Sequence, residues 1–410
     1  MSNNTKREAM ATNNNDKTLN VPPLRFPEFS GEWYSYPLTD FMSFKNGMNP
    51  DAKRFGRGIK FISVMDILNN QFICYDNIRA SVEVIEGDIE TYGVNYGDIL
   101  FQRSSETLED VGQANVYLDR KPAVFGGFVI RGKSKGNYHP VFFRYLLASP
   151  TARKRIIVKG AGAQHFNIGQ DGLSRVCLNI PSIQEQEKIA KLFECVDTRI
   201  ATQNKIIEKY ESLIKGLNNI LLYGTGGKSV CLGDILLERS ERSRTNNQHE
   251  VLSSTVKGIF SQREYFSKDI ASENNVGYKI IRLHDVVLSP QNLWMGNINY
   301  NDRFEIGIVS PSYKVFSIAD GYDNQFVAAM LKTHRALYSY MMVSEQGASI
   351  VRRNLNMEAF SQLVFKIPSL DKQREIGCAI SLLKSQLKTA NKLIRAYTSQ
   401  KQYLLRQMFI

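Results

Sequence analysis

The chain has 410 residues, of which 43% are hydrophobic and 22% are charged, a composition that is ordinary for a globular protein of more than one domain. It contains no apolar run near the roughly 20 residues that a membrane span requires, which excludes that class of protein. Lys and Arg outnumber Asp and Glu by 52 to 40, and the net charge of +12 favours an anionic partner, most simply nucleic acid. Solubility alone is the alternative explanation of the charge.

The first residues, 1–20 (MSNNTKREAMATNNNDKTLN), are polar and rich in Asn. They lack the apolar region of a secretory signal, so we predict a disordered tail. The five cysteines show neither C-x-x-C pairing nor metal-ligand spacing, which predicts reduced thiols in a cytosol. Cys195 and Cys378 fall within helical patterns, and we expect them to pack as small hydrophobes.

Two domains of mixed structure are predicted, over residues 21–180 and 230–367. The first carries the β-rich runs KFISV, DILFQ and VFGGFVI, separated by Gly, Asn and Asp turns. A helical stretch, PVFFRYLLASPTARKRIIV, precedes its final strand. The second carries the run YKVFSI and the helical stretch NQFVAAMLKTHRALYSYMMV. Both domains are therefore assigned to the α+β class.

A long helix is predicted after each domain, over 181–223 and 368–410, with GTGGKS (224–229) as a flexible linker. Pro181 ends a strand, Ser182 caps the first helix, and Glu185 completes a capping box. Apolar residues then recur at alternating spacings of four and three, the pattern of a coiled-coil seam. The first seam is Ile189, Phe193, Val196, Ile200, Gln203, Ile207, Tyr210, Ile214, Leu217 and Leu221. The second is Ile376, Ile380, Leu383, Leu387, Ala390, Ile394, Tyr397, Lys401, Leu404 and Met408.

Gln203, Ala390 and Lys401 interrupt these seams. Two matching seams in one chain most simply bury each other, so we predict an antiparallel coiled coil with a pseudo-twofold axis. The alternative is a pair of amphipathic helices that pack on separate cores.

The domain and its helix form a unit that is present twice. NIPSIQEQEKIAKLF, from Asn179, matches KIPSLDKQREIGCAI, from Lys366, with Pro181 and Pro368 lying 187 residues apart (368 − 181). At the same offset YGDILF meets LHDVVL, which aligns Asp98 with Asp285. Farther back the register shifts to 194, where PLTDF meets CLGDI (231 − 37).

In these motifs the chain closely resembles the specificity subunit of Type I restriction–modification enzymes. The resemblance covers nearly all of the chain after Val21. It rests on VPPLRFPEFSGEW (21–33), on YGDILF, and on the two IPS…Q…I junctions that open the long helices. The family favours a Glu-Gln pair at the junction. Glu185-Gln186 matches it, and Lys372-Gln373 departs at the first position.

The resemblance implies that each domain is a target recognition domain, reading one half of a split, asymmetric DNA site. It implies that the paired helices act as a ruler and as the dock for two modification subunits, joined by up to two restriction subunits. Glu185, Gln186 and Gln373 are the expected partner-docking residues. The chain itself would be non-catalytic, with S-adenosylmethionine, ATP and Mg²⁺ held by its bacterial or archaeal partners.

Motifs of a catalytic centre are missing from the sequence. There is no NPP or DPP for a DNA methyltransferase, and GTGGKS has Leu222 where a phosphate-binding loop needs its first glycine. The five histidines show no metal or triad spacing. Two rival interpretations remain open: a freestanding methyltransferase or endonuclease with atypical motifs, and a coiled-coil scaffold without a DNA role.

For DNA contacts we single out loops that combine Arg or Lys with Gln or Asn, because Arg reads guanine and Gln or Asn reads adenine. In the first domain these loops contain Lys53, Arg54, Arg57, Gln102, Arg103, Ser104, Gln164, His165 and Asn167. In the second they contain Arg239, Arg242, Arg244, Gln291, Asn292, Trp294, Arg352, Arg353 and Asn354. The basic run Arg153, Lys154 and Arg155 is expected to meet phosphates.

Overall fold

The computed structural model describes residues 20–162, 164–223, 226–265, 274–346 and 353–410. Unit one comprises the described residues up to Thr202 together with Ile394–Ile410, and unit two comprises Gln203–Leu393. The predicted tail, apart from Asn20, and residues 224–225 of the predicted linker lie outside the described residues. The mixed helix–strand composition is confirmed, as are the two long helices, α6 (Ile183–Tyr223) and α12 (Leu370–Gln407).

Unit one is built on two sheets. One has the strand order β2 (Met42–Asn46), β10 (Val129–Ser134), β6 (Ile99–Gln102), β8 (Ala114–Val116), with antiparallel neighbours. The other has the order β4 (Ala80–Val82), β3 (Phe55–Ile62), β9 (Ala123–Phe125), β5 (Gly93–Val94), in which β3 and β9 run parallel. Two further pairs join β1 (Tyr34–Pro37) to β12 (Cys177–Ile180) and β7 (Ser104–Ser105) to β11 (Phe166–Asn167).

The helices of unit one are short apart from the segments of α6 and α12. They are α1 (Val64–Asn69), α2 (Asp88–Tyr92), α3 (Pro140–Ala148), α4 (Pro150–Ile157) and α5 (Gln170–Ser174), with 3₁₀ turns η1 (Leu38–Asp40), η2 (Ala52–Arg54) and η3 (Tyr75–Asn77). The predicted helical stretch is thus two helices. Ser149 ends α3, and its Oγ accepts a hydrogen bond from Ala152 N at the start of α4, where Pro150 suits the first turn.

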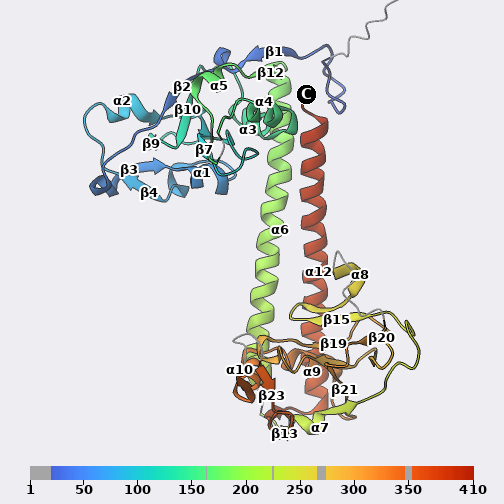
Figure 1. The fold of residues 1–410 in the computed structure, drawn as a ribbon. Helices are drawn as coiled ribbons and strands as arrows, with labels where there is room; N and C mark the ends of the chain where they lie inside the picture. Colours follow the sequence, from blue (N-terminus) through green and yellow to red (C-terminus); the bar gives the residue numbers. More distant parts are fainter. Residues whose placement is uncertain (1–19, 163, 224–225, 266–273, 347–352) are drawn as a thin grey trace, which may run out of the picture. The chain divides into compact units, whose positions relative to one another are not determined.

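Strand β6 shows how the sequence places the core of unit one. Ile99 and Phe101 face one apolar cluster, while Leu100, on the opposite side of the pleat, faces another that lies between the sheets. The first cluster continues through α3 to the start of α6, where Tyr145 stacks on Phe193 with ring centroids 4.7 Å apart. Figure 1 shows α3 and α4 beside the first turns of α6.

Residues of α6 and α12 contact each other inside each unit. In unit one, Phe193 packs on Phe409 and Asp197 Oδ1 meets Lys401 Nζ at 2.6 Å. A step forward along α6 therefore corresponds to a step backward along the C-terminal segment. In unit two, Gln203 Nε2 donates to Ala390 O at 3.2 Å. The three residues that interrupt the seams thus take part in polar contacts. Gln203 and Lys401 do so through their side chains, and Ala390 through its carbonyl oxygen.

Unit two repeats part of this plan, with one four-stranded sheet and four strand pairs among its described residues. Its central sheet has the order β14 (Leu236–Arg239), β21 (Lys314–Ile318), β18 (Val286–Leu288), β19 (Ile298–Tyr300). Further pairs are β13 (Lys228–Cys231) with β24 (Val364–Ile367), β15 (Leu252–Thr255) with β16 (Gly258–Ser261), β17 (Lys279–Arg282) with β20 (Ile306–Val309), and β22 (Ser344–Gln346) with β23 (Arg353–Leu355). Strand β18 alternates as β6 does, with Val286 and Leu288 in one cluster and Val287 in another.

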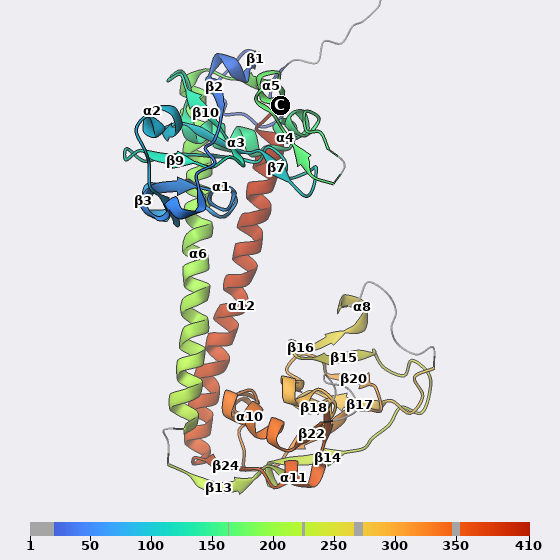
Figure 2. The same cartoon turned by 60° about the vertical axis from the view of Figure 1, so that its left-hand side comes forward.

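The helices of unit two are α7 (Leu232–Ile235), α8 (Gln262–Tyr265), α9 (Asn324–Met330), α10 (His334–Met342) and α11 (Met357–Ser361), with the 3₁₀ turn η4 (Leu293–Met295). Figure 2 shows α10 beside the segments of the long helices that belong to this unit. No helix among the described residues is long and apolar enough to cross a membrane. The cysteines are free, but Cys195 and Cys378 are exposed, so the expectation that they pack as small hydrophobes is wrong.

Candidate nucleic-acid interface

In unit one, two of the predicted loops meet where β6 ends. The chain leaves β6 at Gln102, and Ser104 begins β7, which pairs with β11 so that Ser104 lies opposite Asn167. The Ser104 hydroxyl donates to Asn167 Oδ1. Gln164 and His165 are exposed on the same stretch as Asn167. Folding therefore gathers a guanidinium, a hydroxyl, an imidazole and two amides at one strand end.

Arg103 and Gln102 have different roles in this loop. Arg103 is partly exposed, and its Nη1 donates to Gly127 O at 3.3 Å, leaving other guanidinium donors for a ligand. Gln102 is only 5% exposed, and its Nε2 donates to Ser104 O at 2.9 Å. A base contact by Gln102 does not fit this burial. It shapes the bend that carries Arg103 and Ser104.

The three residues of the basic run on α4 differ in their exposure and contacts. Arg153 points inward, where its Nη2 donates to Glu109 O at 2.8 Å and to Val111 O at 2.7 Å, and burial lowers the pKa of the guanidinium. Arg155 Nη1 donates to Cys177 O at 3.0 Å. Lys154 is exposed. Phosphate contact therefore suits Lys154, whereas for Arg153 the expectation is corrected, because its guanidinium supports the loop before β8.

The basic residues of the loop from Lys53 to Arg57 also differ in their exposure and contacts. Arg54 pairs with Asp88 and donates from Nε to Glu83 O at 2.8 Å, so its side chain holds η2 to the neighbouring loop. Arg57 Nη2 meets Glu83 Oε2 at 2.7 Å, but both side chains are exposed. An exposed pair of this kind is weak and exchanges readily for a phosphate. Lys53 is exposed as well.

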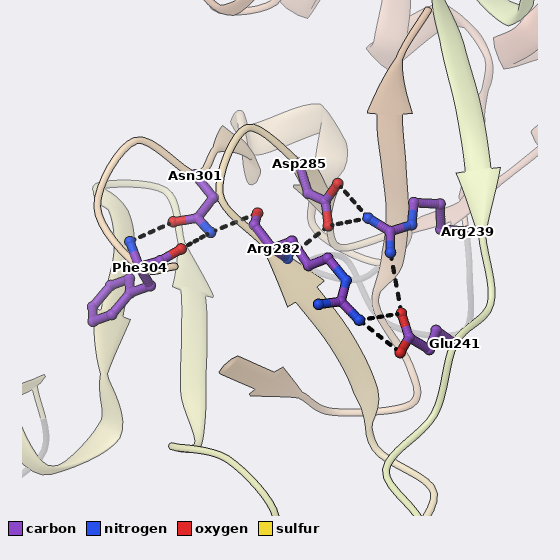
Figure 3. A network of polar contacts seen from close by, with 6 residues as sticks. All are labelled: Arg239, Glu241, Arg282, Asp285, Asn301 and Phe304. Carbon is purple, nitrogen blue, oxygen red and sulfur yellow. Dashed lines mark hydrogen bonds and ion pairs between the residues drawn. The ribbon is translucent and has the colours of Figure 1, made fainter. Parts of the chain in front are cut away.

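Arg239, in unit two, belongs to a network rather than to a reading loop. Its Nη1 donates to both oxygens of Asp285, at 3.0 and 3.1 Å, and its Nη2 meets Glu241, which also binds Arg282 (Figure 3). Asp285 also accepts from Arg282 N at 2.7 Å, and burial raises the pKa of its carboxyl. Direct base reading by Arg239 does not fit these contacts.

This network marks a turn that both units share. Asp98, which aligns with Asp285, accepts from Asn95 N at 3.0 Å, three residues earlier, as Asp285 does from Arg282 N. Asn301 secures the turn in unit two by donating to the carbonyl oxygens of Arg282 and Phe304, at 2.8 and 2.7 Å (Figure 3). The aligned aspartates are therefore structural residues that immediately precede β6 and β18.

The remaining predicted residues of unit two lie at two places. Arg242 Nη1 donates to Gly277 O at 2.9 Å, and Arg244 is exposed nearby in sequence. At the other place, Arg353 N donates to Gln291 O at 3.2 Å, and the Arg353 guanidinium lies 4.9 Å from the centre of the Trp294 ring. Asn292 precedes η4, and Asn354 is exposed on β23. Arg352 lies outside the described residues.

The second place corresponds to the cluster in unit one. Gln291 and Asn354 stand at the repeat positions of Ser104 and Asn167, each 187 residues on (291 − 104 and 354 − 167). In both units the segment after the central strand meets the segment before a short helix, α5 or α11. The two units thus present different polar and aromatic side chains on one shared framework.

The three residues expected to dock partners are buried and form hydrogen bonds within this chain. Glu185 is 1% exposed and accepts two hydrogen bonds from Arg25, both at 2.7 Å, and one from Trp33 Nε1 at 3.3 Å. Ser182 Oγ accepts from Glu185 N at 3.4 Å, but the Glu185 carboxylate turns to Arg25 and does not complete a capping box. Docking through this side chain does not fit its burial.

Gln186 and Gln373 make equivalent pairs of hydrogen bonds in the two units. Gln186 accepts from His139 N and donates to Pro181 O, both at 3.0 Å. Gln373 accepts from Asp323 N and donates to Pro368 O, again both at 3.0 Å. Each buried amide therefore ties the start of a long helix to the residue that caps α3 or α9, which is an internal role and not a docking role.

A cavity beside Arg103 was not anticipated from the sequence. It has a volume of about 400 Å³ and is lined by residues 48–50, 55, 61, 63–65 and 126–129. Its signal in the sequence is the run VFGGFVI, which we read as one β-rich run. The structure divides it into β9 and β10 with a Gly126-Gly127-Phe128 turn between them. Among the described residues, no cluster of three or more His, Cys, Asp or Glu could hold a metal ion.

Comparison with known proteins agrees with this geometry. Residues 30–212 match the family model of the Type I restriction modification DNA specificity domain. The type I restriction enzyme MjaX specificity subunit of Methanocaldococcus jannaschii is 24% identical over 206 residues, 49% of this chain and 48% of that protein. The type I restriction enzyme EcoKI specificity subunit of Escherichia coli K12 is 24% identical over 181 residues, 42% of this chain and 38% of that protein.

The chain thus spans about half or less of the length of these curated relatives. A crystal structure of the S subunit of a type I restriction–modification system from M. genitalium has the same fold, with a TM-score of 0.57 and 14% identity over 95% of this chain and 99% of that one. Residues 30–212 therefore match a Type I restriction modification DNA specificity domain, in a chain similar to the specificity subunits of type I restriction enzymes.

Proposed function

We propose that this chain is the DNA sequence-specificity subunit of a type I restriction–modification complex and binds a bipartite, asymmetric site. Residues 21–180 would read one half of the site and residues 230–367 the other. One observation carries the proposal. The same framework position is built twice with different base-reading side chains, Arg103 and Asn167 in one unit and Gln291, Arg353 and Asn354 in the other.

The chemistry of these side chains suits direct readout in the major groove. Arg binds guanine O6 and N7, and Asn or Gln binds adenine N6 and N7, so two different sets specify two different half-sites. Exposed Lys53 and Lys154 supply cations for the phosphate backbone, which positions the protein without reading sequence. The net charge of +12 favours the same partner over long range.

We further propose that α6 and α12 pair as an antiparallel coiled coil with a pseudo-twofold axis. Gln203 and Ala390, which are in contact, stand at equivalent positions of the repeat (390 − 203 = 187), as expected near such an axis. The opposite running of the Phe193–Phe409 and Asp197–Lys401 contacts supports the same pairing. The helices would then fix the spacing between the half-sites.

Methylation and cleavage would reside in partner subunits. We propose two modification subunits, which use S-adenosylmethionine, and up to two restriction subunits, which use ATP and Mg²⁺. This chain would supply recognition and no catalytic centre. Because Glu185, Gln186 and Gln373 are buried, partner contact would use other, exposed residues.

The deciding experiment is methylome sequencing of a host that carries this chain with its partners. A split motif is expected, and exchange of residues 230–367 for those of a relative should change only one half of it. A change of both halves would refute the division of labour. Binding by the purified chain should fall steeply with salt. Salt-independent binding would favour a scaffold, and methylation by the chain alone would favour a freestanding enzyme.

Within unit one, Arg103→Ala tests the placement of the reading loop. A lost guanine contact costs about 1–3 kcal/mol on the cognate site and relaxes specificity in the first half-site. The measurement is a pair of binding isotherms, on cognate and scrambled DNA, over a salt series. An equal loss on both DNAs would identify Arg103 as a phosphate contact or a structural residue.

A further inference from the structure

The cavity beside Arg103 is lined mainly by apolar and aromatic groups. Phe55, Phe61 and Phe128 contribute rings, and Met65 contributes its thioether. Phe128 is 70% exposed, Met65 is 61% exposed and Phe55 is 42% exposed, although all three line one cavity. Single exposed hydrophobic residues are common, but a contiguous group around a cavity marks a binding site.

The wall that carries Phe128 is held tightly. Gly126 N donates to Ile62 O, and Met48 N donates to Phe125 O, both at 3.0 Å. A Cβ at Gly127 would overlap the side-chain amide of Asn49, so this amide lies close against the glycine. The turn therefore brings an exposed ring, that of Phe128, and the Asn49 amide to the same cavity.

The cavity is continuous with the proposed reading loop. Arg103 N donates to Phe128 O at 2.9 Å, and Arg103 Nη1 donates to Gly127 O. A base edge that meets the Arg103 guanidinium would lie close to the Gly127–Phe128 backbone, which forms part of the cavity wall. The cavity therefore lies within reach of groups that DNA bound at this loop can supply.

We propose that this cavity binds one nucleobase that has left the base stack of the first half-site. This inference rests on the proposed function. Aromatic rings stack on the face of any base, and an Asn amide can donate to and accept from a base edge. Enzymes that methylate a base in duplex DNA extrude it, which leaves a base without its partner. A cavity of about 400 Å³ has room for a base.

The test uses the full chain in its complex, on synthetic duplexes of the target site once that site is known. Each position of the first half-site is replaced in turn by a mismatch and by an abasic residue. At one position a mismatch should tighten binding about tenfold, because unpairing no longer opposes binding. An abasic residue at the same position should weaken binding about tenfold, because no base remains to stack.

Three variants make the test specific. Phe128→Ala should remove both effects, and Phe128→Trp should keep both, because it retains an aromatic face. Tyr96→Ala is the matched control, since Tyr96 is 58% exposed but lies at the other end of β6 from Arg103, and it should change neither effect. Because Phe128 is exposed, Phe128→Ala should melt at the wild-type temperature.

The inference is overturned if no position shows the paired effect, or if Phe128→Ala retains it. It is also overturned if Phe128→Ala leaves both effects intact but loses assembly with a protein partner, which would make the cavity a protein contact. Should the wild-type complex not prefer its target at all, the proposed function fails. Should Arg103→Ala lose specificity while the paired effect is absent, only this inference fails.

Discussion

Replacement of Glu185 by Ala should destabilise unit one strongly. Its carboxylate is buried, with a side-chain exposure of 2%, and its partner Arg25 has a side-chain exposure of 12%. The substitution leaves two guanidinium donors and the indole N–H of Trp33 without their acceptor. Breaking a buried ion pair in this way costs about 3–5 kcal/mol. Arg25 keeps its bonds to the carbonyl oxygens of Ser30 and Gly31, so we expect a loss of about 3 kcal/mol.

The repeat provides a matched control at the equivalent position. Lys372 pairs with Glu375 at 2.7 Å, but both side chains are exposed, so Lys372→Ala should change stability by less than about 0.5 kcal/mol. Urea unfolding is followed by the fluorescence of Trp33, which reports on unit one, and of Trp294, which reports on unit two, together with circular dichroism. A loss below about 1 kcal/mol for Glu185→Ala, or equal losses at both positions, would refute the assignment of a buried ion pair.

Three other substitutions test separate features. Lys154→Ala should weaken binding to all DNA sequences alike and lower the salt slope by about one phosphate contact. Arg153→Ala should mainly lower the free energy of unfolding. Identical behaviour of the two variants would contradict the inward orientation of Arg153. Burial lowers the pKa of Lys332 from 10.5 to about 8. Between these two pH values the unfolded chain binds more protons than the folded chain. The free energy of unfolding should therefore rise with pH over this range, by up to about 3 kcal/mol. Lys332→Met should remove that rise in urea titrations, and a rise unchanged from wild type would contradict it. Ile207→Asp should cost several kcal/mol in thermal melts, because it places a charge in the seam of the long helices, and a normal melt would count against the seam.

The long helices were predictable because their signal is local. A spacing of four and three repeats along each helix, and the seam residues that the structure describes are buried or half-buried. The repeat also aligned Asp98 with Asp285, and the structure gives both the same backbone contact. Patterns within a few residues of each other, and patterns repeated along the chain, are therefore accessible from one sequence.

The role of each polar residue was not predictable, because its partner is remote in sequence. Arg153 and Lys154 are adjacent, yet the carbonyl oxygens that hold Arg153 come from a loop more than forty residues earlier. Gln186 meets His139 N only after the domain has folded onto its helix. Sequence therefore identified the loops that carry polar groups, and tertiary structure decided which groups face solvent.

The core of unit one contains residues from α12 and the segment after it, which the ribosome synthesises long after the rest of this unit. Trp33, Phe142 and Phe193 pack against Phe409, with ring centroids 5.6 to 6.4 Å apart, and Leu24 N donates to Gln407 O. Phe409 leaves the ribosome roughly 200 residues after Phe193, an interval of about 10–40 seconds at ordinary rates of synthesis. During that time the first domain has an open apolar surface where Met408 and Phe409 will lie. Nascent chains would be most open to chaperones and proteases in this interval, and the last helical turns close the domain that was begun first.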